Sequence, residues 1–416
     1  MNGELKKHDS AVYKLLSKER ERERDGLELI PSENYASPAV LEAMGSILTN
    51  KYAEGYPGKR YYGGNIWIDE VERLAQTRAM KLFGLDSEEY AVNVQPYSGS
   101  PANIAAYVAL ADFGDTIMGL ALTQGGHLTH GHKVNFSGKA FKVVSYHVRE
   151  KDELLDYEEI RRLAQETKPK IIVSGATAYP RIIDFKKFQD IAGEVGAIHM
   201  ADISHIAGLI AAGVHPSPFP FTDVVTTTTH KTLRGPRGAV IFAKKEYAER
   251  IDRAVFPGIQ GGPHEHIIAA KAVCFHEAMQ PSFKKYAAQV VKNAKVLAAA
   301  LMAHGFRLAT DGTENHLILV DLTGKGTAGK EAQELLDAAG MTVNKNTVPR
   351  ETRTPFDPSG IRLGTPAVTT RGMKEKAMEQ IAAWMNEVLH ARDTKTCARV
   401  KKEVTALARK FPVPGI

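Results

Sequence analysis

A short segment near residue 100 could bind a phosphate group. Ser98-Gly-Ser-Pro-Ala-Asn103 follows an apolar run and precedes a helical pattern, with Ser100 suited to the N-cap and Pro101 to the first helical position. The free amides and hydroxyls at such a helix start form an anion-binding cup, to which Ser98, Gly99 and Ser100 would contribute. Taken alone, such a segment is more often simply a capped helix.

Two further segments place reactive side chains at the ends of apolar strands. Ala197-Ile-His-Met-Ala-Asp-Ile-Ser-His205 brings Asp202 to a strand end, where its carboxylate could hold a cationic ring nitrogen or cap the next helix. Asp223-Val-Val-Thr-Thr-Thr-Thr-His230-Lys231 ends in a lysine, and a glycine-rich turn with two arginines follows. This lysine could form a Schiff base with a carbonyl cofactor, although single loop lysines usually lie on the surface.

Together, the phosphate cup, the carboxylate and the lysine fit pyridoxal 5′-phosphate. This cofactor needs an amine for its Schiff base, an anion site for its phosphate, and a carboxylate that keeps its pyridine nitrogen protonated. His127, in Gly125-Gly-His-Leu-Thr-His-Gly131, could place an imidazole against the cofactor ring, or could be a loop histidine bonded to the backbone. We therefore predict a pyridoxal-phosphate site around Lys231 and Asp202, and we expect no metal.

Alternating strands and helices would position these residues. Short β-branched runs predict seven strands, with helical patterns between them at 101–112, 157–166 and 185–195. This order is typical of an α/β fold with a mainly parallel seven-stranded sheet covered on both faces, in which ligands bind at the carboxyl ends of the strands. The predicted strands are Tyr90–Val94, Thr116–Gly119, Phe141–Ser145, Lys170–Ser174, Ala197–Ala201, Asp223–Thr228 and Ala239–Phe242.

The remaining sequence predicts a second, smaller α/β domain. Beyond Pro281 come a helix over 286–303, a strand over 316–320 and a helix over 330–339. A last long helix follows Arg371, because apolar residues recur there every three or four positions. We expect an N-terminal helical arm over 1–25, a large cofactor-binding domain over 26–280 and a small C-terminal domain over 281–416.

The composition argues against several classes of protein. The chain has 416 residues, 43% hydrophobic and 25% charged, with a formal charge of +6, which is ordinary for a globular protein and weak evidence for nucleic-acid binding. Two cysteines, Cys274 and Cys397, do not make a disulfide framework. The N-terminus lacks the apolar core of a signal peptide, and the most apolar long stretch is interrupted by charged and histidine residues. We expect a soluble, cytoplasmic protein without a membrane span.

Several long segments resemble the serine hydroxymethyltransferase family of fold-type I pyridoxal-phosphate enzymes. They follow one order along nearly the whole chain, from Glu28-Leu-Ile-Pro-Ser-Glu-Asn-Tyr35 to the tail Phe411-Pro-Val-Pro-Gly415. Between these lie Asn50-Lys-Tyr-Ala-Glu-Gly-Tyr-Pro-Gly-Lys-Arg-Tyr-Tyr-Gly-Gly64 and Phe256-Pro-Gly-Ile-Gln-Gly-Gly-Pro263. Matches of this length and order do not arise by chance.

The resemblance implies a reversible transfer of the hydroxymethyl group of L-serine to tetrahydrofolate, giving glycine and 5,10-methylenetetrahydrofolate through aldimine and quinonoid intermediates. It also implies a homodimer with shared active sites, or a tetramer. The alternative is a folate-independent aldolase or transaldolase of the same fold, acting on threonine or another β-hydroxy amino acid. A non-catalytic scaffold or RNA-binding protein is less favoured, because the lysine, aspartate and arginine set is complete.

The resemblance also assigns cofactor roles position by position. Lys231 would form the Schiff base, Asp202 would pair with the pyridine nitrogen, and His127 would stack on the ring. His205 would lie near the phenolic oxygen of the cofactor. The other cofactor contacts would be Ser98, Gly99, Ser100, Thr177 and His230, with Tyr52 and Gly262 reaching the phosphate of the neighbouring subunit.

Substrate and folate contacts follow from the same resemblance. Arg362, in Ser359-Gly-Ile-Arg-Leu-Gly-Thr-Pro366, would clamp the substrate carboxylate, a task that suits a planar two-pronged donor. Glu54 would transfer a proton during carbon exchange. Departures from the family pattern at Thr123-Gln124 and Asp357-Pro358 border the expected folate channel. The other expected contacts are Ser32 and Tyr62 for the substrate, Arg237 for the cofactor or the sheet edge, and Leu122, Gly126 and Asn346 for folate.

Overall fold

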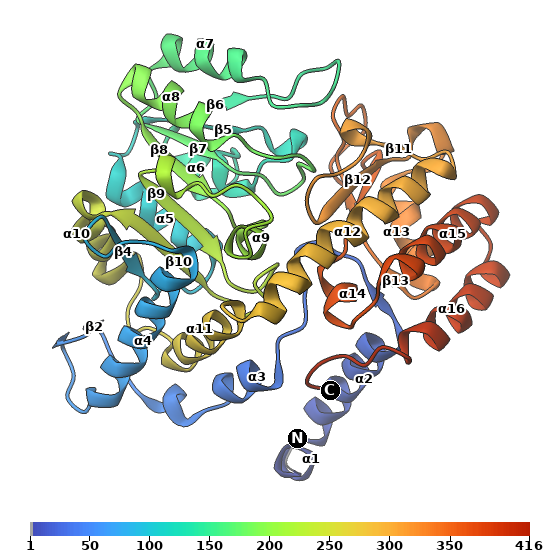
Figure 1. Ribbon diagram of the computed structural model, residues 1–416, viewed down its shortest axis with the longest axis horizontal. Helices are drawn as coiled ribbons and strands as arrows, with labels where there is room; N and C mark the ends of the chain where they lie inside the picture. The colour runs from blue at the N-terminus through green and yellow to red at the C-terminus, as the bar shows by residue number, and fades with distance from the viewer. Residues whose placement is uncertain (1–2) are drawn as a thin grey trace.

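One seven-stranded sheet forms the centre of the computed structural model, which describes residues 3–416 (Figure 1). The strand order is β4-β10-β9-β8-β7-β5-β6, in which β10 runs antiparallel to both of its neighbours and the other pairs are parallel. The predicted mainly parallel sheet is therefore confirmed. Its strands are β4 (Tyr90–Asn93), β5 (Thr116–Leu120), β6 (Lys142–Tyr146), β7 (Ile171–Ser174), β8 (Ile198–Asp202), β9 (Val224–Thr228) and β10 (Ala239–Lys244).

Helices cover both faces of this sheet, because its strands are apolar on both sides. Neighbouring residues of β7 divide between two buried clusters: Ile172 packs in one, and Ile171 and Val173 pack in the other. Successive side chains of a strand point to opposite faces, so the two clusters lie on the two sides of the sheet. The helices of this region are α5 (Gly99–Leu110), α6 (Phe136–Ala140), α7 (Tyr157–Thr167), α8 (Phe185–Val195), α9 (Ala207–Ala211) and α10 (Lys245–Arg253).

The N-terminal residues form helices that project from the body of the molecule (Figure 1). The Asp9 side chain caps the second of these helices by accepting hydrogen bonds from the amides of Ala11 and Val12. Helices thus occupy the region of the expected N-terminal arm, and the bounds of that arm stay a prediction. The helices of this part, and those that follow beside the sheet, are α1 (Glu4–His8), α2 (Ser10–Asp25), α3 (Pro38–Met44), α4 (Ile66–Phe83) and α11 (Glu265–Ala278), with a short hairpin of β2 (Gly55–Tyr56) and β3 (Lys59–Arg60).

The C-terminal residues build a smaller antiparallel sheet with its own core. Its strand order is β11-β12-β15-β14, and helices cover it (Figure 1). The elements are α12 (Pro281–Ala303), β11 (Arg307–Leu308), β12 (Leu317–Asp321), α13 (Gly329–Ala338), β14 (Asn344–Asn346), β15 (Gly360–Gly364), α14 (Pro366–Thr370), α15 (Glu375–Ala391) and α16 (Thr394–Ala408).

The helix after Arg371 is confirmed as α15, but the expectation that it is the last helix was wrong. A further helix, α16, follows it after a short turn. Asp393 caps α16 through the amide of Thr396, and the buried residues Cys397, Val400, Val404 and Ala408 recur at helical spacing against the C-terminal core.

The N-terminal segment also contributes to the C-terminal core. Strand β1 (Leu27–Glu28) pairs in parallel with β13 (Met341–Thr342), and Leu27 and Leu29 are buried among C-terminal residues. The domain boundaries expected at 25 and 280 stay a prediction. Over residues 3–416, the helices are too short or too polar to cross a membrane.

A buried carboxylate fixes the C-terminal sheet against the larger sheet. Glu153 lies in the loop after β6 and accepts hydrogen bonds from the Thr310 amide and from the guanidinium groups of Arg307 and Arg350. Glu153 is 3% exposed, and a buried carboxylate is tolerated when donors surround it in this way. This contact sets the position of the strands that carry Asn346 and Arg362.

Candidate active site

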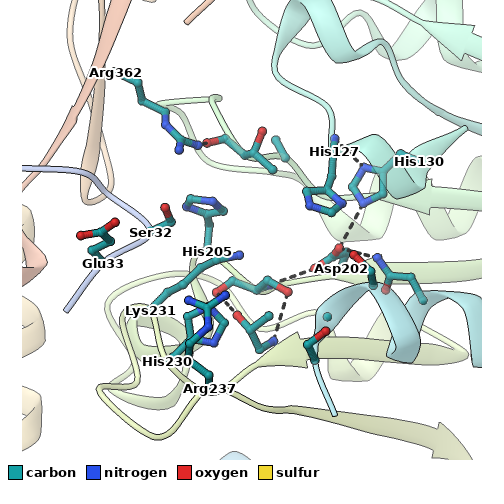
Figure 2. Close-up of a pocket in the computed structure, with 18 of the residues that line it drawn as sticks. Ser32, Glu33, His127, His130, Asp202, His205, His230, Lys231, Arg237 and Arg362 are labelled. Atoms are coloured by element: carbon teal, nitrogen blue, oxygen red, sulfur yellow. Dashed lines mark hydrogen bonds and ion pairs between the residues drawn. The ribbon is translucent and has the colours of Figure 1, made fainter. Parts of the chain in front are cut away.

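The largest group of predicted site residues meets in one pocket between the two sheets (Figure 2). The pocket has a volume of about 410 Å³ and lies at the carboxyl ends of β8 and β9, as expected for an open α/β sheet. Strands β14 and β15 close it from the C-terminal side. Its lining includes the predicted residues Ser32, Ser98, Gly99, Ser100, His127, Thr177, Asp202, His205, His230, Lys231, Arg237, Asn346 and Arg362.

Asp202 is held as a buried anion at the end of β8. Its Oδ2 accepts hydrogen bonds from Asn103 Nδ2 at 2.9 Å and pairs with His130 Nε2 at 3.1 Å, while Oδ1 accepts from the Ser204 amide at 3.1 Å. Burial by itself would raise the pKa of Asp202, but the hydrogen bond from His130 and the nearby positive groups outweigh it and hold the pKa well below its usual range. The carboxylate is therefore ready to pair with a cationic ligand atom.

His127 presents a neutral imidazole to the same space. Its Nδ1 accepts a hydrogen bond from the Thr129 amide at 3.2 Å and lies 2.7 Å from the Thr129 hydroxyl. Burial lowers the pKa of His127 to about 4. The ring is thus bonded to the loop backbone and also lines the pocket, while its stacking against a cofactor stays a prediction.

Lys231 supplies a buried amine. The residue is 9% exposed, and Figure 2 shows its side chain extending toward Asp202. Burial lowers the pKa of Lys231 to about 8, with Asp202 opposing this shift and the guanidinium groups of Arg362 and Arg237 adding to it. About one tenth of the amine is thus unprotonated at pH 7, far more than for an ordinary lysine, and this is the form that attacks a carbonyl carbon.

The phosphate cup begins earlier than the sequence predicts. Helix α5 starts at Gly99 with Ser98 at the N-cap, so the prediction of Ser100 as cap and Pro101 as first helical residue was wrong. A Cβ atom at Gly99 would lie 2.8 Å from Thr228 Cγ2, and glycine permits this close approach to β9. The first amides of a helix have no acceptor within it. In the described chain the Ser98 side chain does not cap α5 either, which leaves these groups for an anion.

The C-terminal sheet supplies one wall of the pocket. Arg362 Nη1 donates to the Thr177 carbonyl at 2.6 Å and Nε donates to Asn344 Oδ1 at 3.1 Å. Burial lowers the pKa of Arg362 to about 10, so the group stays a cation near neutral pH. His205 lies 3.2 Å from His316, Nδ1 to Nε2, and burial lowers the pKa of both rings. The pocket therefore pairs a fixed guanidinium with neutral imidazoles.

Four predicted residues gather elsewhere, in an exposed cluster beside the β2–β3 hairpin. The Tyr52 hydroxyl donates to Glu54 Oε1 at 3.3 Å, and the Tyr52 and Tyr62 rings lie 5.0 Å apart. Gly262 packs against the Tyr52 ring, and its carbonyl accepts from the Tyr97 hydroxyl at 2.6 Å. Among residues 3–416 this cluster does not line the pocket. The roles given to its members stay predictions.

The predicted folate contacts divide in the same way. Asn346 lines the pocket, whereas Leu122 and Gly126 belong to the neighbouring loop rather than to the described lining. The Thr177 hydroxyl fixes that loop by donating to the Gly126 carbonyl at 2.9 Å. Gly126 is also confined, because a Cβ atom there would meet the Leu120 carbonyl oxygen at 1.9 Å. The folate roles stay predictions.

Sequence reasoning missed several lining residues, of which Asn103 and His130 matter most. Both lie inside the predicted motifs: Asn103 is one helical turn beyond the cup, and His130 follows His127 by three positions. The helical spacing from Gly99 was the signal that could have identified Asn103. His127, His130 and Asp202 also offer ligand atoms within 4.8 Å of one another, so the expected absence of a metal stays a prediction. The other missed lining residues are Glu33, Ala176, Ser204 and Thr228.

Comparison with known families agrees with this chemistry. A family model described as serine hydroxymethyltransferase matches residues 5–385 of the chain. The chain belongs to the serine hydroxymethyltransferase family. Family membership makes it a pyridoxal-phosphate-dependent transferase of one-carbon metabolism with a fold of type I. The pocket fits that cofactor, because it combines a buried amine, a held carboxylate and free amides at a helix start. The resemblance seen in the sequence is thereby confirmed.

The lowered pKa of Lys231 predicts how its amine reacts with the cofactor aldehyde. In the cofactor-free chain, the rate of imine formation with pyridoxal 5′-phosphate should fall about tenfold per pH unit below the pKa and level off above it. Because burial lowers this pKa to about 8, the midpoint of the profile should lie there. Stopped-flow absorbance at varied pH measures it, with free lysine as the reference.

The variant Asp202→Asn tests the charge that opposes this shift. The Asp202 charge raises the pKa of Lys231, so its removal should move the midpoint to lower pH. A midpoint in the native chain near the ordinary lysine value of 10.5, or an upward movement in the variant, would contradict the assignment.

Proposed function

We propose that this enzyme transfers the hydroxymethyl group of L-serine to tetrahydrofolate, giving glycine and 5,10-methylenetetrahydrofolate, and that the reaction is reversible. One observation carries the proposal: a single pocket holds a buried amine from one sheet and a fixed guanidinium from the other. An amine suits a carbonyl cofactor, and a guanidinium suits the carboxylate of an amino acid. Pyridoxal phosphate, when bound, supplies an electron sink for charge that develops at the substrate α-carbon.

Asp202 and the phosphate cup would hold that cofactor at its two ends. Asp202 keeps its charge because His130 and Asn103 hydrogen bond to it, so it can stabilise a proton on a ring nitrogen. The amides at the start of α5 would bind the phosphate. His127 would lie against the cofactor ring. Because its imidazole is neutral, it would not compete with the ring nitrogen for pairing with Asp202.

Arg362 would orient serine for the bond that breaks. Its contacts to Thr177 and Asn344 fix the guanidinium plane, so a carboxylate bound to it is held in one orientation. Ser32 lines the pocket and could donate a hydrogen bond to the same carboxylate. Burial lowers the pKa of Lys231 to about 8. Its Nζ atom could therefore take up and return a proton when the amino group of the substrate takes the place of the lysine amine.

We further propose that two copies of the chain share each active site. The cluster of Tyr52, Glu54 and Tyr62 lies beside a strongly exposed apolar surface, where Tyr61 is 76% and Trp67 is 77% exposed. Contiguous exposed apolar surface usually marks a contact with another molecule. In a dimer that covers this surface, Glu54 of one subunit would reach the pocket of the other and act as the acid or base of the folate step.

An absorption spectrum tests the function directly. The holoenzyme should show a cofactor band that changes with glycine, and a strong new band at longer wavelength when tetrahydrofolate is added as well. A band that responds to amino acids but not to folate would favour the aldolase or transaldolase. No cofactor band after reconstitution with pyridoxal phosphate would refute the proposed function.

The variant Arg362→Lys tests the carboxylate clamp. Lysine keeps the charge but loses the planar pair of donors, so the KM for serine should rise about 10- to 100-fold. The KM for tetrahydrofolate should change little, because folate does not use this contact. Steady-state kinetics measure both constants, and Arg353→Lys, on an exposed arginine of the nearby loop, is the control. An unchanged KM for serine would show that Arg362 does not bind the substrate.

Mixed dimers test the shared site. We expect Lys231→Ala and Glu54→Gln to be inactive alone. When both variants are unfolded and refolded together, one site of each mixed dimer regains an intact pair, so about one quarter of the wild-type activity should return. If both residues serve the pocket of their own chain, no activity returns and the shared site is refuted.

A further inference from the structure

Lys271 is a buried basic residue that the reaction described above does not use, and burial lowers its pKa to about 7. It lies in α11 and is 1% exposed. Its Nζ donates to the carbonyls of Val94 at 2.7 Å, Pro96 at 3.0 Å and Ala239 at 2.8 Å. An ammonium group has three protons to donate, so each one is matched to a main-chain oxygen. Burying a charge is costly unless it is hydrogen bonded in this way.

The carbonyls that Lys271 binds belong to two loops of the cofactor site. Val94 and Pro96 follow β4 and lead directly into the phosphate cup at Ser98. Ala239 begins β10, directly after the turn that follows Lys231. Together with the hydrogen bond from the Ala239 amide to the Pro96 carbonyl at 3.2 Å, the Lys271 side chain therefore joins the segment that leads into the phosphate cup to the start of β10.

Packing around Lys271 is adapted to this arrangement. A Cβ atom at Gly238 would lie 2.5 Å from Lys271 Cε and 3.2 Å from its Nζ, so glycine leaves the space that the lysine occupies. Gln260 holds the same segment, because it accepts from the Tyr97 amide at 3.0 Å and donates to the Gln95 carbonyl at 3.1 Å. Residues 94–97 are thus held by both Lys271 and Gln260, while the cup beyond them is left for a ligand.

We propose that Lys271 is a positioning residue, which sets the distance between the phosphate cup and the Lys231 amine. The cofactor must reach both at once, so a cup displaced relative to Lys231 would lose hydrogen bonds to the phosphate. The inference rests on the cofactor assignment proposed above. It concerns the phosphate end of the cofactor alone, because Lys231 stays able to form an imine.

A comparison of two aldehydes tests this role. Pyridoxal 5′-phosphate needs both the cup and Lys231, whereas pyridoxal, which lacks the phosphate, needs only Lys231. In Lys271→Met the dissociation constant for pyridoxal 5′-phosphate should rise about 10- to 100-fold, the effect of losing one hydrogen bond to a charged group. The constant for pyridoxal should stay within about threefold of the wild-type value. Absorbance titration of the cofactor-free full chain measures both.

A matched control separates positioning from general stability. Arg371 is also a buried basic residue that donates to main-chain carbonyls, including those of Gly26, Phe411 and Ala408, but it lies in the C-terminal part. In Arg371→Met, the ratio of the two dissociation constants should match that of the wild type even if the melting temperature falls. A specific rise of the ratio in Lys271→Met, absent from this control, is the expected result.

A second variant keeps the test decisive if Lys271→Met does not fold. Gly238→Ala retains the lysine but places a methyl group against its Cε atom, so it should raise the same ratio by a smaller factor. A folded variant of either kind with the wild-type ratio would overturn the positioning role alone. A wild-type chain that binds both aldehydes equally would overturn the cofactor assignment and this inference with it.

Discussion

The buried charge of Asp202 is the interaction on which the site depends. The carboxylate ends β8, in the interior of the sheet, where an unpaired charge would be strongly unfavourable. Its donors come from two separate segments, Asn103 from α5 and His130 from the loop after β5. Satisfying the anion therefore fixes the start of α5, which carries the phosphate cup, and the loop that carries His127. The hydrogen bonds that the buried carboxylate needs thus position three parts of the proposed cofactor site: Asp202 itself, the phosphate cup and the loop that carries His127.

The other half of the pocket depends on how the C-terminal sheet docks. Arg362 donates to the Thr177 carbonyl, which follows β7 of the large sheet, so the guanidinium both faces the pocket and joins the two sheets. Glu153 provides a second contact between the sheets by accepting hydrogen bonds from Arg307, Arg350 and Thr310. The residues proposed to recognise serine are therefore held by contacts between the sheets, whereas those proposed to hold the cofactor belong mainly to one sheet.

The sequence predicted the parts of this site that are local, and missed those that depend on distant contacts. The seven strands and the ends that carry Asp202 and Lys231 follow from β-branched runs with polar residues at their ends. The side-chain donors of Asp202 lie 99 and 72 positions away in the chain, and no local pattern reports such a pairing. The cap of α5 was misplaced because the preference for serine at an N-cap and proline after it ignores the approach of Gly99 to Thr228. Tertiary packing decided that boundary.

Most of the predicted site residues are of two kinds: those that line the pocket, and those in the exposed cluster beside the β2–β3 hairpin. Apart from Tyr52 and Gly262, the residues proposed for the cofactor line the pocket of one chain, so a single copy can preorganise them. The Tyr52 hydroxyl donates to Glu54 and the Tyr52 ring contacts that of Tyr62, but in the chain that the structure describes both tyrosines are exposed and Glu54 is only half-buried. A carboxylate acts as a general acid or base only within hydrogen-bond reach of the group whose proton it transfers, which here requires a change in its surroundings. In the proposed dimer, association would supply that change by covering the cluster with the second subunit, so the folate step would depend on assembly while cofactor binding would be built mainly into each chain.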